Sequence, residues 1–346
     1  MRARLCGTSI WAILAAAACL ALAAVASARP ADGPDARAGG GVARDAESAI
    51  FYYPWFGTPA RDGDWIHWRQ GGTRPPRSIG ANYYPARGPY SSGDAAVVAA
   101  QMREIAAAGV DTVIVSWWGR GSLEDQRLPL VLAAARTARL GVAAHIEPYG
   151  GRSVVSTAAD IAYLRGLGLT DFYVWASVDS PDVEWREALS RLQADVRVFA
   201  NTNFPAKAKA GGFSGVYTYD VLLYDGHFFP RMCAQARRLH LLCAPSVGPG
   251  YDARRATGDR RLRPRRGGAT YDAMWRGALR ADADVVTITS YNEWHEGTQI
   301  EPARAVRGYV SYAGAWGKRG QAAETAYLER TAYWTKRLVG SRLASE

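Results

Sequence analysis

The chain alternates short apolar, β-rich runs with Ala-, Leu- and Arg-rich helical stretches, and the alternation repeats eight times. This repeat constrains the fold most, because a helix after each strand returns the chain so that the next strand can pair in parallel. Eight such units are typical of a closed (β/α)8 barrel. The expected strands are Ile50–Phe56, Thr112–Trp118, Val142–Pro148, Phe172–Ala176, Val196–Thr202, Gly215–Tyr219, Leu241–Ser246 and Val285–Tyr291.

The helical stretches between these strands include Asp94–Ala108, Glu124–Arg139 and Tyr271–Arg280. An open, doubly wound sheet has the same alternation and is the alternative fold. It would be supported by a Gly-rich, phosphate-binding turn at the start of a helix, and no such motif opens a helix in this sequence. We therefore predict an α/β protein with one TIM-barrel domain over residues 47–340.

The two ends of the chain have a different character. Residues 1–28 match an export signal, with Arg2 and Arg4 before the apolar run Ile10–Val25 and a small-residue cleavage site. The run is short for a membrane span, so we expect its removal and a secreted or envelope-associated protein without stable membrane insertion. Residues 29–46 are expected to form a flexible tether and residues 341–346 a C-terminal tail.

The formal net charge of +10 raises the question of nucleic-acid binding. Arginines crowd one loop over residues 254–266, but this loop lacks the interleaved aromatic rings of a strand-binding surface. We expect a solvated basic loop and no nucleic-acid partner, and we expect a monomer. Outside the signal the chain has Cys233 and Cys243, for which two buried thiols are favoured over a disulfide because their expected helix and strand need not bring the Cβ atoms together.

The candidate catalytic residues are Glu293 and Glu296, which follow the eighth expected strand within the segment 290–297. Positions i and i+3 of an extended strand face opposite sides. The strand must therefore end near Asn292 and turn, and Gly297 suits such a turn. Two carboxylates beside aromatic rings are what glycoside hydrolysis requires. The alternative interpretation is an acidic turn on the surface.

Other expected strand ends carry aromatic rings, amides and carboxylates, including Tyr53, Trp118, Glu147 and Tyr219. Active sites of these barrels lie at the C-terminal ends of the strands, so the set is typical of a carbohydrate cleft. Some of these rings could instead fill the barrel interior. Trp117 and Trp118 are adjacent, so at most one points inward, and we expect Trp118 to face the cleft.

Seven collinear motifs identify a family resemblance. They are Phe51–Gly57, Ile66–Trp68, Val115–Trp118, His145–Tyr149, Gly215–Tyr219, Pro245–Tyr251 and Tyr291–Glu301. With these motifs the chain resembles glycoside hydrolase family 99, the endo-α-mannosidases and endo-α-1,2-mannanases, along nearly its whole length after the tether. The resemblance implies a (β/α)8 barrel that needs no metal or cofactor and retains the anomeric configuration.

The resemblance also implies roles for single residues. Glu296 would protonate the leaving oxygen, and Glu293 would take the proton of the sugar 2-hydroxyl, so that O2 displaces the leaving group through a 1,2-anhydro intermediate. The expected substrate-binding residues are Tyr53, His67, Trp118, Glu147, Tyr219 and Asn292. A buried, hydrogen-bonded histidine is nevertheless the default reading of His67 and of His145. Trp118 implies a distal mannose, and hence hydrolysis of internal α-1,2-mannosidic linkages in α-mannans, N-glycans or other mannose-containing oligosaccharides.

The sequence also departs from the family pattern and leaves alternatives open. The segment 150–171 is shorter than the corresponding segment of family members. Trp175-Ala176-Ser177-Val178 stands where they tend to have Tyr-Asp-Ser-Tyr. A non-catalytic carbohydrate-binding protein and a transglycosylase would use the same residues. A metal-dependent hydrolase using His295 is a further alternative, but no His-Glu-x-x-His pattern occurs and ligands so close in sequence would strain a tetrahedral site.

Overall fold

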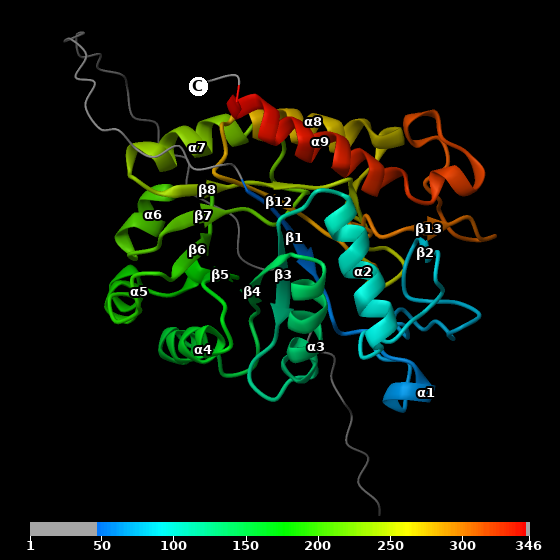
Figure 1. Ribbon diagram of the computed structural model, residues 1–346, viewed down its shortest axis with the longest axis horizontal. Coiled ribbons are helices and arrows are strands. Elements are labelled where there is room, and N and C mark those ends of the chain that lie inside the picture. The colour runs from blue at the N-terminus through cyan, green and yellow to red at the C-terminus, as the bar shows by residue number, and fades with distance from the viewer. Residues whose placement is uncertain (1–46, 344–346) are drawn as a thin grey trace, which may run out of the picture. The chain divides into compact units, whose positions relative to one another are not determined.

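The computed structural model describes residues 47–343 and confirms the (β/α)8 barrel (Figure 1). All strands of the barrel run in parallel, and Ile50 of the first strand lies between Val113 and Ile288 of its two neighbours. The strands are β1 (Glu47–Tyr52), β3 (Thr112–Trp117), β4 (Gly141–Ile146), β5 (Asp171–Val174), β6 (Arg197–Asn201), β7 (Gly215–Tyr217), β8 (Leu242–Ala244), β9 (Ser246–Val247) and β12 (Val285–Ile288).

The barrel closes through its seventh strand, which is split into β8 and β9 at Pro245. β8 pairs with β7, whereas β9 pairs with β12, which in turn pairs with β1. Proline has no N–H to donate to a ladder, which accounts for the break. Its carbonyl still accepts the Thr287 N–H at 3.1 Å, so the connection continues across the break. This closure excludes the open, doubly wound sheet.

Helices surround the strands, and a helix follows each strand in sequence except β8, which leads directly into β9 (Figure 1). The helix α3 begins where Ser122 Oγ accepts the Asp125 N–H at 3.1 Å, a typical N-cap. The helices of the barrel are α2 (Ala95–Ala107), α3 (Leu123–Thr137), α4 (Val154–Gly166), α5 (Asp182–Leu189), α6 (Pro205–Ala210), α7 (Phe229–Arg238), α8 (Ala269–Arg280) and α9 (Ala326–Leu343).

Smaller elements occupy the connections. The short helix α1 (Pro59–Asp62) follows β1. β2 (Tyr84–Pro85) pairs antiparallel with β13 (Ala303–Arg304). β10 (Tyr251–Asp252) and β11 (Leu262–Arg263) form a hairpin in the Arg-rich loop.

Aromatic side chains fill the barrel interior beneath the strand ends. The Phe51 ring centre lies 4.9 Å from that of His145 and 5.0 Å from that of Tyr219. Tyr173 stacks on Phe199 with 4.7 Å between ring centres. Full burial of such a ring contributes roughly 1.5–3 kcal/mol to the free energy of folding. Because these rings pack closely, they fix the positions of the residues at the strand ends.

The Cys233 and Cys243 sulfurs form a disulfide between α7 and β8, with 5.2 Å between the Cα atoms. The expectation of two buried thiols is therefore wrong. The turn after α7 explains the difference, because the Leu239 and Leu241 N–H groups both donate to the Ala236 carbonyl and fold β8 directly back onto the helix.

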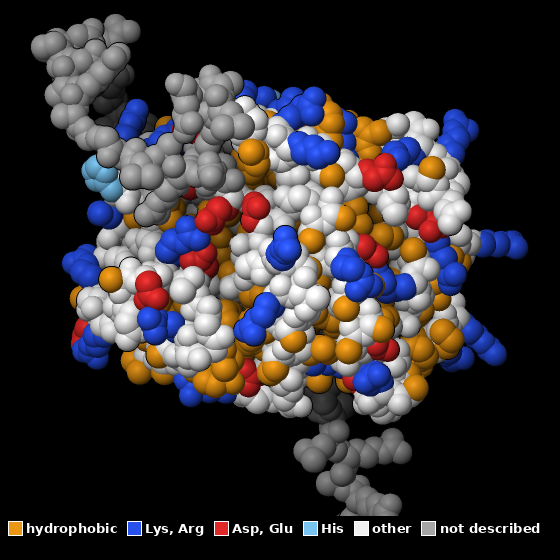
Figure 2. Space-filling model, in the orientation of Figure 1, with side chains coloured by type: hydrophobic (Ala, Val, Ile, Leu, Met, Phe, Trp, Pro, Cys, Tyr) orange, Lys and Arg blue, Asp and Glu red, His pale blue; other side chains and the backbone are white. Residues whose placement is uncertain are grey.

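The ends of the chain lie partly beyond the described residues. The expected export signal (residues 1–28) and tether (residues 29–46) fall outside them. α9 continues to Leu343, into the segment expected to be a tail. Over residues 47–343, no helix combines the length and apolar character that a membrane crossing needs. On the face shown in Figure 2, basic side chains are dispersed among acidic and apolar ones.

Candidate active site

The segment that carries both candidate carboxylates leaves β12 after Ile288 and turns. The Glu293 N–H donates to Ser290 Oγ at 2.9 Å, and the Trp294 N–H donates to the Asn292 carbonyl at 2.9 Å. Gly297 has a φ of +63°, and a Cβ at that position would lie 2.8 Å from the Asp252 carbonyl oxygen. Only glycine fits both conditions. The turn anticipated from the sequence thus begins about three residues earlier than expected.

Asn292 joins the ends of the first and eighth strands. Its Oδ1 accepts the Tyr53 N–H at 2.7 Å, and its Nδ2 donates to the Tyr53 carbonyl at 3.0 Å and to the Tyr90 hydroxyl at 3.2 Å. The side chain is fully buried, and both of its N–H groups are used. We therefore correct the expectation of a sugar contact: Asn292 positions Tyr53.

Glu293 lies against a neutral histidine. Its Oε1 accepts the backbone N–H of His295 at 3.0 Å and lies 3.5 Å from the ring nitrogen His295 Nδ1. His295 Nε2 lies 2.6 Å from the His67 carbonyl oxygen, so this nitrogen must carry the proton. Burial lowers the pKa of His295 to about 4, which leaves Nδ1 unprotonated at neutral pH. An acceptor nitrogen therefore faces the Glu293 carboxyl group.

Both carboxyl groups have a raised pKa. Burial, followed by the charge of Glu296, raises the pKa of Glu293 well above its ordinary value. Burial also raises the pKa of Glu296 to about 8, with the charges of Asp220 and Glu147 adding to the rise. Two such groups lose their protons in coupled steps. At neutral pH the pair therefore retains a proton that it can donate.

A pair of tyrosines and a third carboxylate lie beside the two acids. The hydroxyls of Tyr53 and Tyr219 are 2.5 Å apart, and both phenols are within electrostatic reach of Glu293 and Glu296. Glu147 is buried and comes from the neighbouring end of β4. These residues, which the sequence placed at separate strand ends, are thus brought to one end of the barrel.

Glu147 is held by residues of β3 and β4. Its Oε1 accepts the Ser116 hydroxyl at 2.8 Å and lies 2.9 Å from His145 Nδ1. The indole N–H of Trp118 donates to the same Ser116 oxygen at 3.1 Å. His145 is buried and its Nε2 lies 2.8 Å from the Tyr217 hydroxyl, but its Nδ1 makes no hydrogen bond among residues 47–343, so the default reading of a satisfied histidine holds for one ring nitrogen only.

Trp117 and Trp118 differ in burial, because adjacent side chains of a strand point to opposite faces. Trp117 is fully buried, and its indole N–H donates to Asp125 at 2.9 Å. Trp118 is half-buried and lies at the mouth of the barrel, next to Glu147 through Ser116. Trp118 is therefore the indole available to a ligand.

His67 departs from the default reading of a satisfied histidine. Its ring stacks on Trp55 with 4.4 Å between ring centres and 8° between planes. Burial lowers its pKa to about 3, so the ring is neutral. Among residues 47–343, no partner accepts from or donates to His67 Nδ1 or Trp55 Nε1, although both atoms are buried. These two nitrogens therefore keep hydrogen-bonding capacity beside His295.

Arg265 and Glu301, which the sequence did not predict as site residues, hold the catalytic segment in place. Arg265 of the basic loop is not solvated: its guanidinium lies 4.5 Å from the ring centres of both Tyr83 and Tyr327 and donates to the carbonyls of Gly297 and Gln299 at 2.9 and 2.6 Å. The expectation of a solvated loop is wrong for this arginine.

Glu301 is the second supporting residue, and its side chain is fully buried. Its carboxylate accepts the Trp294 indole N–H at 2.8 Å and the Tyr90 hydroxyl at 2.7 Å. It thereby ties the catalytic segment to the β1 side of the barrel, because Tyr90 also contacts Asn292. Only the pattern of the Tyr291–Glu301 motif hinted at a role for this residue.

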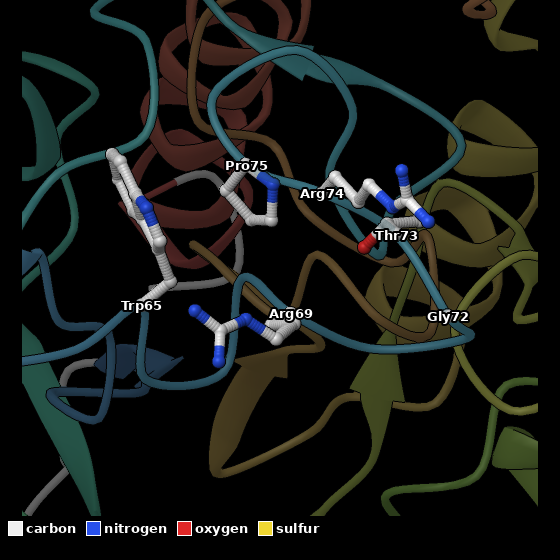
Figure 3. Close-up of a pocket in the computed structure, with 6 residues that line it drawn as sticks. All are labelled: Trp65, Arg69, Gly72, Thr73, Arg74 and Pro75. Carbon is white, nitrogen blue, oxygen red and sulfur yellow. The ribbon is translucent and has the colours of Figure 1, made fainter.

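Two other features of the described residues bear on chemistry. No group of three or more His, Cys, Asp or Glu side chains within residues 47–343 is arranged to hold a metal ion. A surface hollow of about 610 Å³ has none of the expected site residues in its lining (Figure 3). It is lined by Trp65, Arg69, Gly72, Thr73, Arg74 and Pro75.

Comparison with known proteins agrees with this geometry. The sequence profile of Glycosyl hydrolase family 99 matches residues 44–173 and 196–340. The chain is 32% identical to a glycoprotein endo-alpha-1,2-mannosidase-like protein of Danio rerio, over 83% of this chain and 77% of that protein. It is 31% identical to the glycoprotein endo-alpha-1,2-mannosidase of Xenopus laevis, over 73% and 69%. The solved GH99 endo-alpha-mannosidase from Bacteroides thetaiotaomicron superposes with a TM-score of 0.78 at 28% identity, covering 87% of this chain and 99% of that one.

Proposed function

The chain belongs to glycosyl hydrolase family 99, and we propose that it is an endo-acting enzyme that cleaves internal α-1,2-mannosidic linkages of mannans or mannose-containing N-glycans. The observation that carries the proposal is the buried Glu293 and the half-buried Glu296, whose pKa values are both raised beside the Tyr53–Tyr219 hydroxyl pair at the C-terminal ends of the barrel strands. The names of the Danio rerio and Xenopus laevis relatives support the linkage.

In this proposal Glu296 is the general acid. Its pKa of about 8 keeps the carboxyl group protonated at neutral pH, so it can protonate the leaving oxygen and later accept a proton from water. Glu293 is the base. It removes the proton of the substrate 2-hydroxyl, and the unprotonated Nδ1 of His295 beside it favours a proton on this carboxyl group during the step.

The stereochemistry of mannose supports this mechanism. In an α-mannoside the 2-oxygen and the departing oxygen are both axial and trans, so O2 is aligned to displace the leaving group at C1. In an α-glucoside O2 is equatorial and misaligned. A strained 1,2-anhydro sugar would form, and water would open it with retention of configuration. This differs from the more common retaining scheme, in which a carboxylate itself attacks C1.

Digestion of an α-1,2-linked mannan tests the proposal. We expect internal cleavage, seen as a rapid fall in polymer length with oligosaccharide products, and an α-configured first product by NMR. Release of single mannose units from chain ends, or a β-configured first product, would count against it. A matched substrate that lacks the reacting 2-hydroxyl should be inert, and its hydrolysis at a comparable rate would favour direct attack by a carboxylate.

We also propose that the enzyme is exported, on the basis of the pattern in residues 1–28. Expression of the full chain in a secreting host should release a protein whose N-terminus lies near residue 29. Recovery of the intact N-terminus from the cell interior would contradict this.

A further inference from the structure

Large apolar side chains are exposed in the connections that follow three neighbouring strands of the barrel. Phe204 lies between β6 and α6, Leu223 between β7 and α7, and Leu262 in the hairpin that follows β9, with exposed fractions of 62%, 68% and 48%. Connections that follow the strands form the face of the barrel on which Glu293 and Glu296 lie. We call Phe204, Leu223 and Leu262 the apolar rim.

Backbone contacts show that the three connections adjoin one another. In the hairpin, Arg263 donates to the Leu222 carbonyl at 2.9 Å, and this carbonyl belongs to the connection after β7. The Thr202 N–H donates to the Tyr217 carbonyl at 3.2 Å and joins the connection after β6 to the end of β7. The apolar rim therefore lies along one side of the barrel mouth.

Basic side chains flank the apolar rim. Arg260 and Arg261 lie beside it in the hairpin, and Lys207 and Lys209 lie beside it in α6; all four residues are exposed. The three connections together contain seven arginines and four acids, so their net charge is positive. Exposed apolar side chains among cations are typical of a surface that binds a negatively charged lipid interface.

The acids of the three connections leave this surplus of positive charge in place. Three of them form ion pairs with arginines, namely Asp225 with Arg263, Asp252 with Arg254 and Asp259 with Arg261. The fourth, Asp220, accepts backbone N–H groups of its own loop. The surplus cations repel a second copy of the same surface and attract anionic headgroups. Charge therefore favours an anionic lipid surface over self-association.

We propose that the apolar rim and its flanking cations dock the catalytic face of this protein onto an anionic lipid surface. The three apolar side chains enter the boundary between headgroups and acyl chains, and the cations contact lipid phosphates. The barrel mouth then borders the surface, so the substrates within reach are mannose-containing glycans attached to lipid. The docking goes beyond the proposed function, whereas this substrate class rests on it.

Binding to vesicles tests the docking surface. Residues 29–346 contain the whole barrel and omit the apolar run of the signal, which would bind lipid by itself. We expect this protein to bind vesicles of mixed phosphatidylcholine and phosphatidylglycerol at least about tenfold more tightly than vesicles of phosphatidylcholine alone, at low salt. The triple variant Phe204→Ser, Leu223→Ser, Leu262→Ser should bind the mixed vesicles at least about tenfold more weakly than wild type. Arg260→Ala should bind them about fivefold more weakly.

Val339→Ser is the matched control, because Val339 is as exposed as the rim residues but lies at the opposite end of the barrel. Its exposed fraction is 58%, and it belongs to the last turns of α9. One turn earlier, Thr335 Oγ1 donates to the Ala108 carbonyl, just before β3 begins. Val339→Ser should bind the mixed vesicles as tightly as wild type. All the variants should keep the wild-type kcat/KM on a soluble α-mannan, because none of them changes a residue of the catalytic site.

The substrate class has its own assay. An α-1,2-linked oligomannoside on a lipid anchor in the mixed vesicles should be cleaved at least about fivefold faster by wild type than by the triple variant. Equal rates would overturn the substrate class.

The remaining outcomes separate the docking from the proposed function. A wild type that does not prefer the mixed vesicles, or a triple variant that binds them as tightly as wild type, overturns the docking alone. A wild-type dimer that the triple variant separates would overturn it as well, because the rim would then bind a second copy. Wild type that binds the mixed vesicles but cleaves no α-1,2-linked mannan contradicts the proposed function and leaves the docking supported.

Discussion

Replacing Glu301 with alanine should both destabilise the fold and displace the catalytic segment. Its buried carboxylate accepts four donors: the Trp294 indole at 2.8 Å, the Tyr90 hydroxyl at 2.7 Å, Gln101 Nε2 at 2.8 Å and Arg87 Nε at 2.9 Å. The carboxylate is thus the shared acceptor of a network that reaches from β12 to α2 and the β2 region.

The expected loss in the free energy of unfolding of Glu301→Ala follows from the donors that cannot find another acceptor. Arg87 keeps its contact with Glu104 at 2.6 Å, so it is left partly paired. The Trp294 and Tyr90 donors are buried and fixed by packing, and each unsatisfied donor costs about 1–3 kcal/mol. With the cavity left by the side chain, we expect a loss of at least about 3 kcal/mol. For a domain of this length that is a fall in melting temperature of about 5 °C or more.

Activity should fall further than stability alone would require. Without Glu301, Trp294 loses its anchor, and the Tyr90 contact to Asn292 no longer fixes Tyr53. A displacement of about 1 Å at reacting groups can cost about a hundredfold in rate. We therefore expect kcat on an α-mannan to fall at least tenfold at a temperature where the variant remains folded.

Thermal unfolding followed by circular dichroism, with kcat measured on the same samples, is the assay. Glu301→Gln keeps one acceptor oxygen and should lie between the alanine variant and wild type. Glu187→Ala is the control, since Glu187 forms an exposed pair with Arg191 that is worth at most about 1 kcal/mol. A Glu301→Ala protein with the melting temperature and kcat of wild type would refute this reasoning.

Three further outcomes can be checked independently. The alkaline limb of kcat/KM should fall near pH 8, where Glu296 loses its proton, and Asp220→Asn should move that limb to lower pH by removing a charge that raises the pKa; an unmoved limb argues against Glu296 as the acid. Converting Cys233 and Cys243 to serine should reduce the free energy of unfolding by about 3 kcal/mol in denaturant titrations, and an unchanged value would deny the disulfide a stabilising role. With Trp118 at the distal position, an α-1,3-mannosyl substrate should be hydrolysed faster than its α-1,3-glucosyl counterpart, and a clear glucosyl preference contradicts this.

The fold could be predicted because strands of a parallel barrel are buried on both faces and read as continuous apolar runs, as in Thr112–Trp117. The residues at which the strands end could be predicted less accurately than the fold itself. Tyr53, Trp118 and Tyr291 have side chains typical of strands, yet they lie just beyond the ends of β1, β3 and β12. Local propensity does not reveal where a ladder stops and a loop begins to build a site.

The candidate site was predictable to the extent that topology brings strand ends together. Tyr53, Glu147, Tyr219 and the two glutamates follow different strands and meet at one end of the barrel. The supporting contacts were not predictable, because they join segments far apart in sequence. Glu301 and Gln101 are 200 residues apart, and no local pattern relates them. Arg265 looked like one arginine in a basic run, and only the structure reveals the tyrosines around it.

The cysteines show the same limit on a shorter scale. Cys233 and Cys243 are separated by ten residues, and their pairing depends on how tightly α7 turns into β8. That turn is set by two hydrogen bonds to the Ala236 carbonyl, which the sequence does not specify.

The most direct test of the two-carboxylate mechanism is the rate of α-1,2-mannan hydrolysis by Glu293→Gln and Glu296→Gln. Each variant is compared with wild type at a temperature at which both proteins are folded. Positioned proton transfer contributes about a hundredfold to ten-thousandfold, so both variants should lose at least a hundredfold in kcat. If either variant releases product at a rate near that of wild type, the pair does not perform the chemistry, and the account fails.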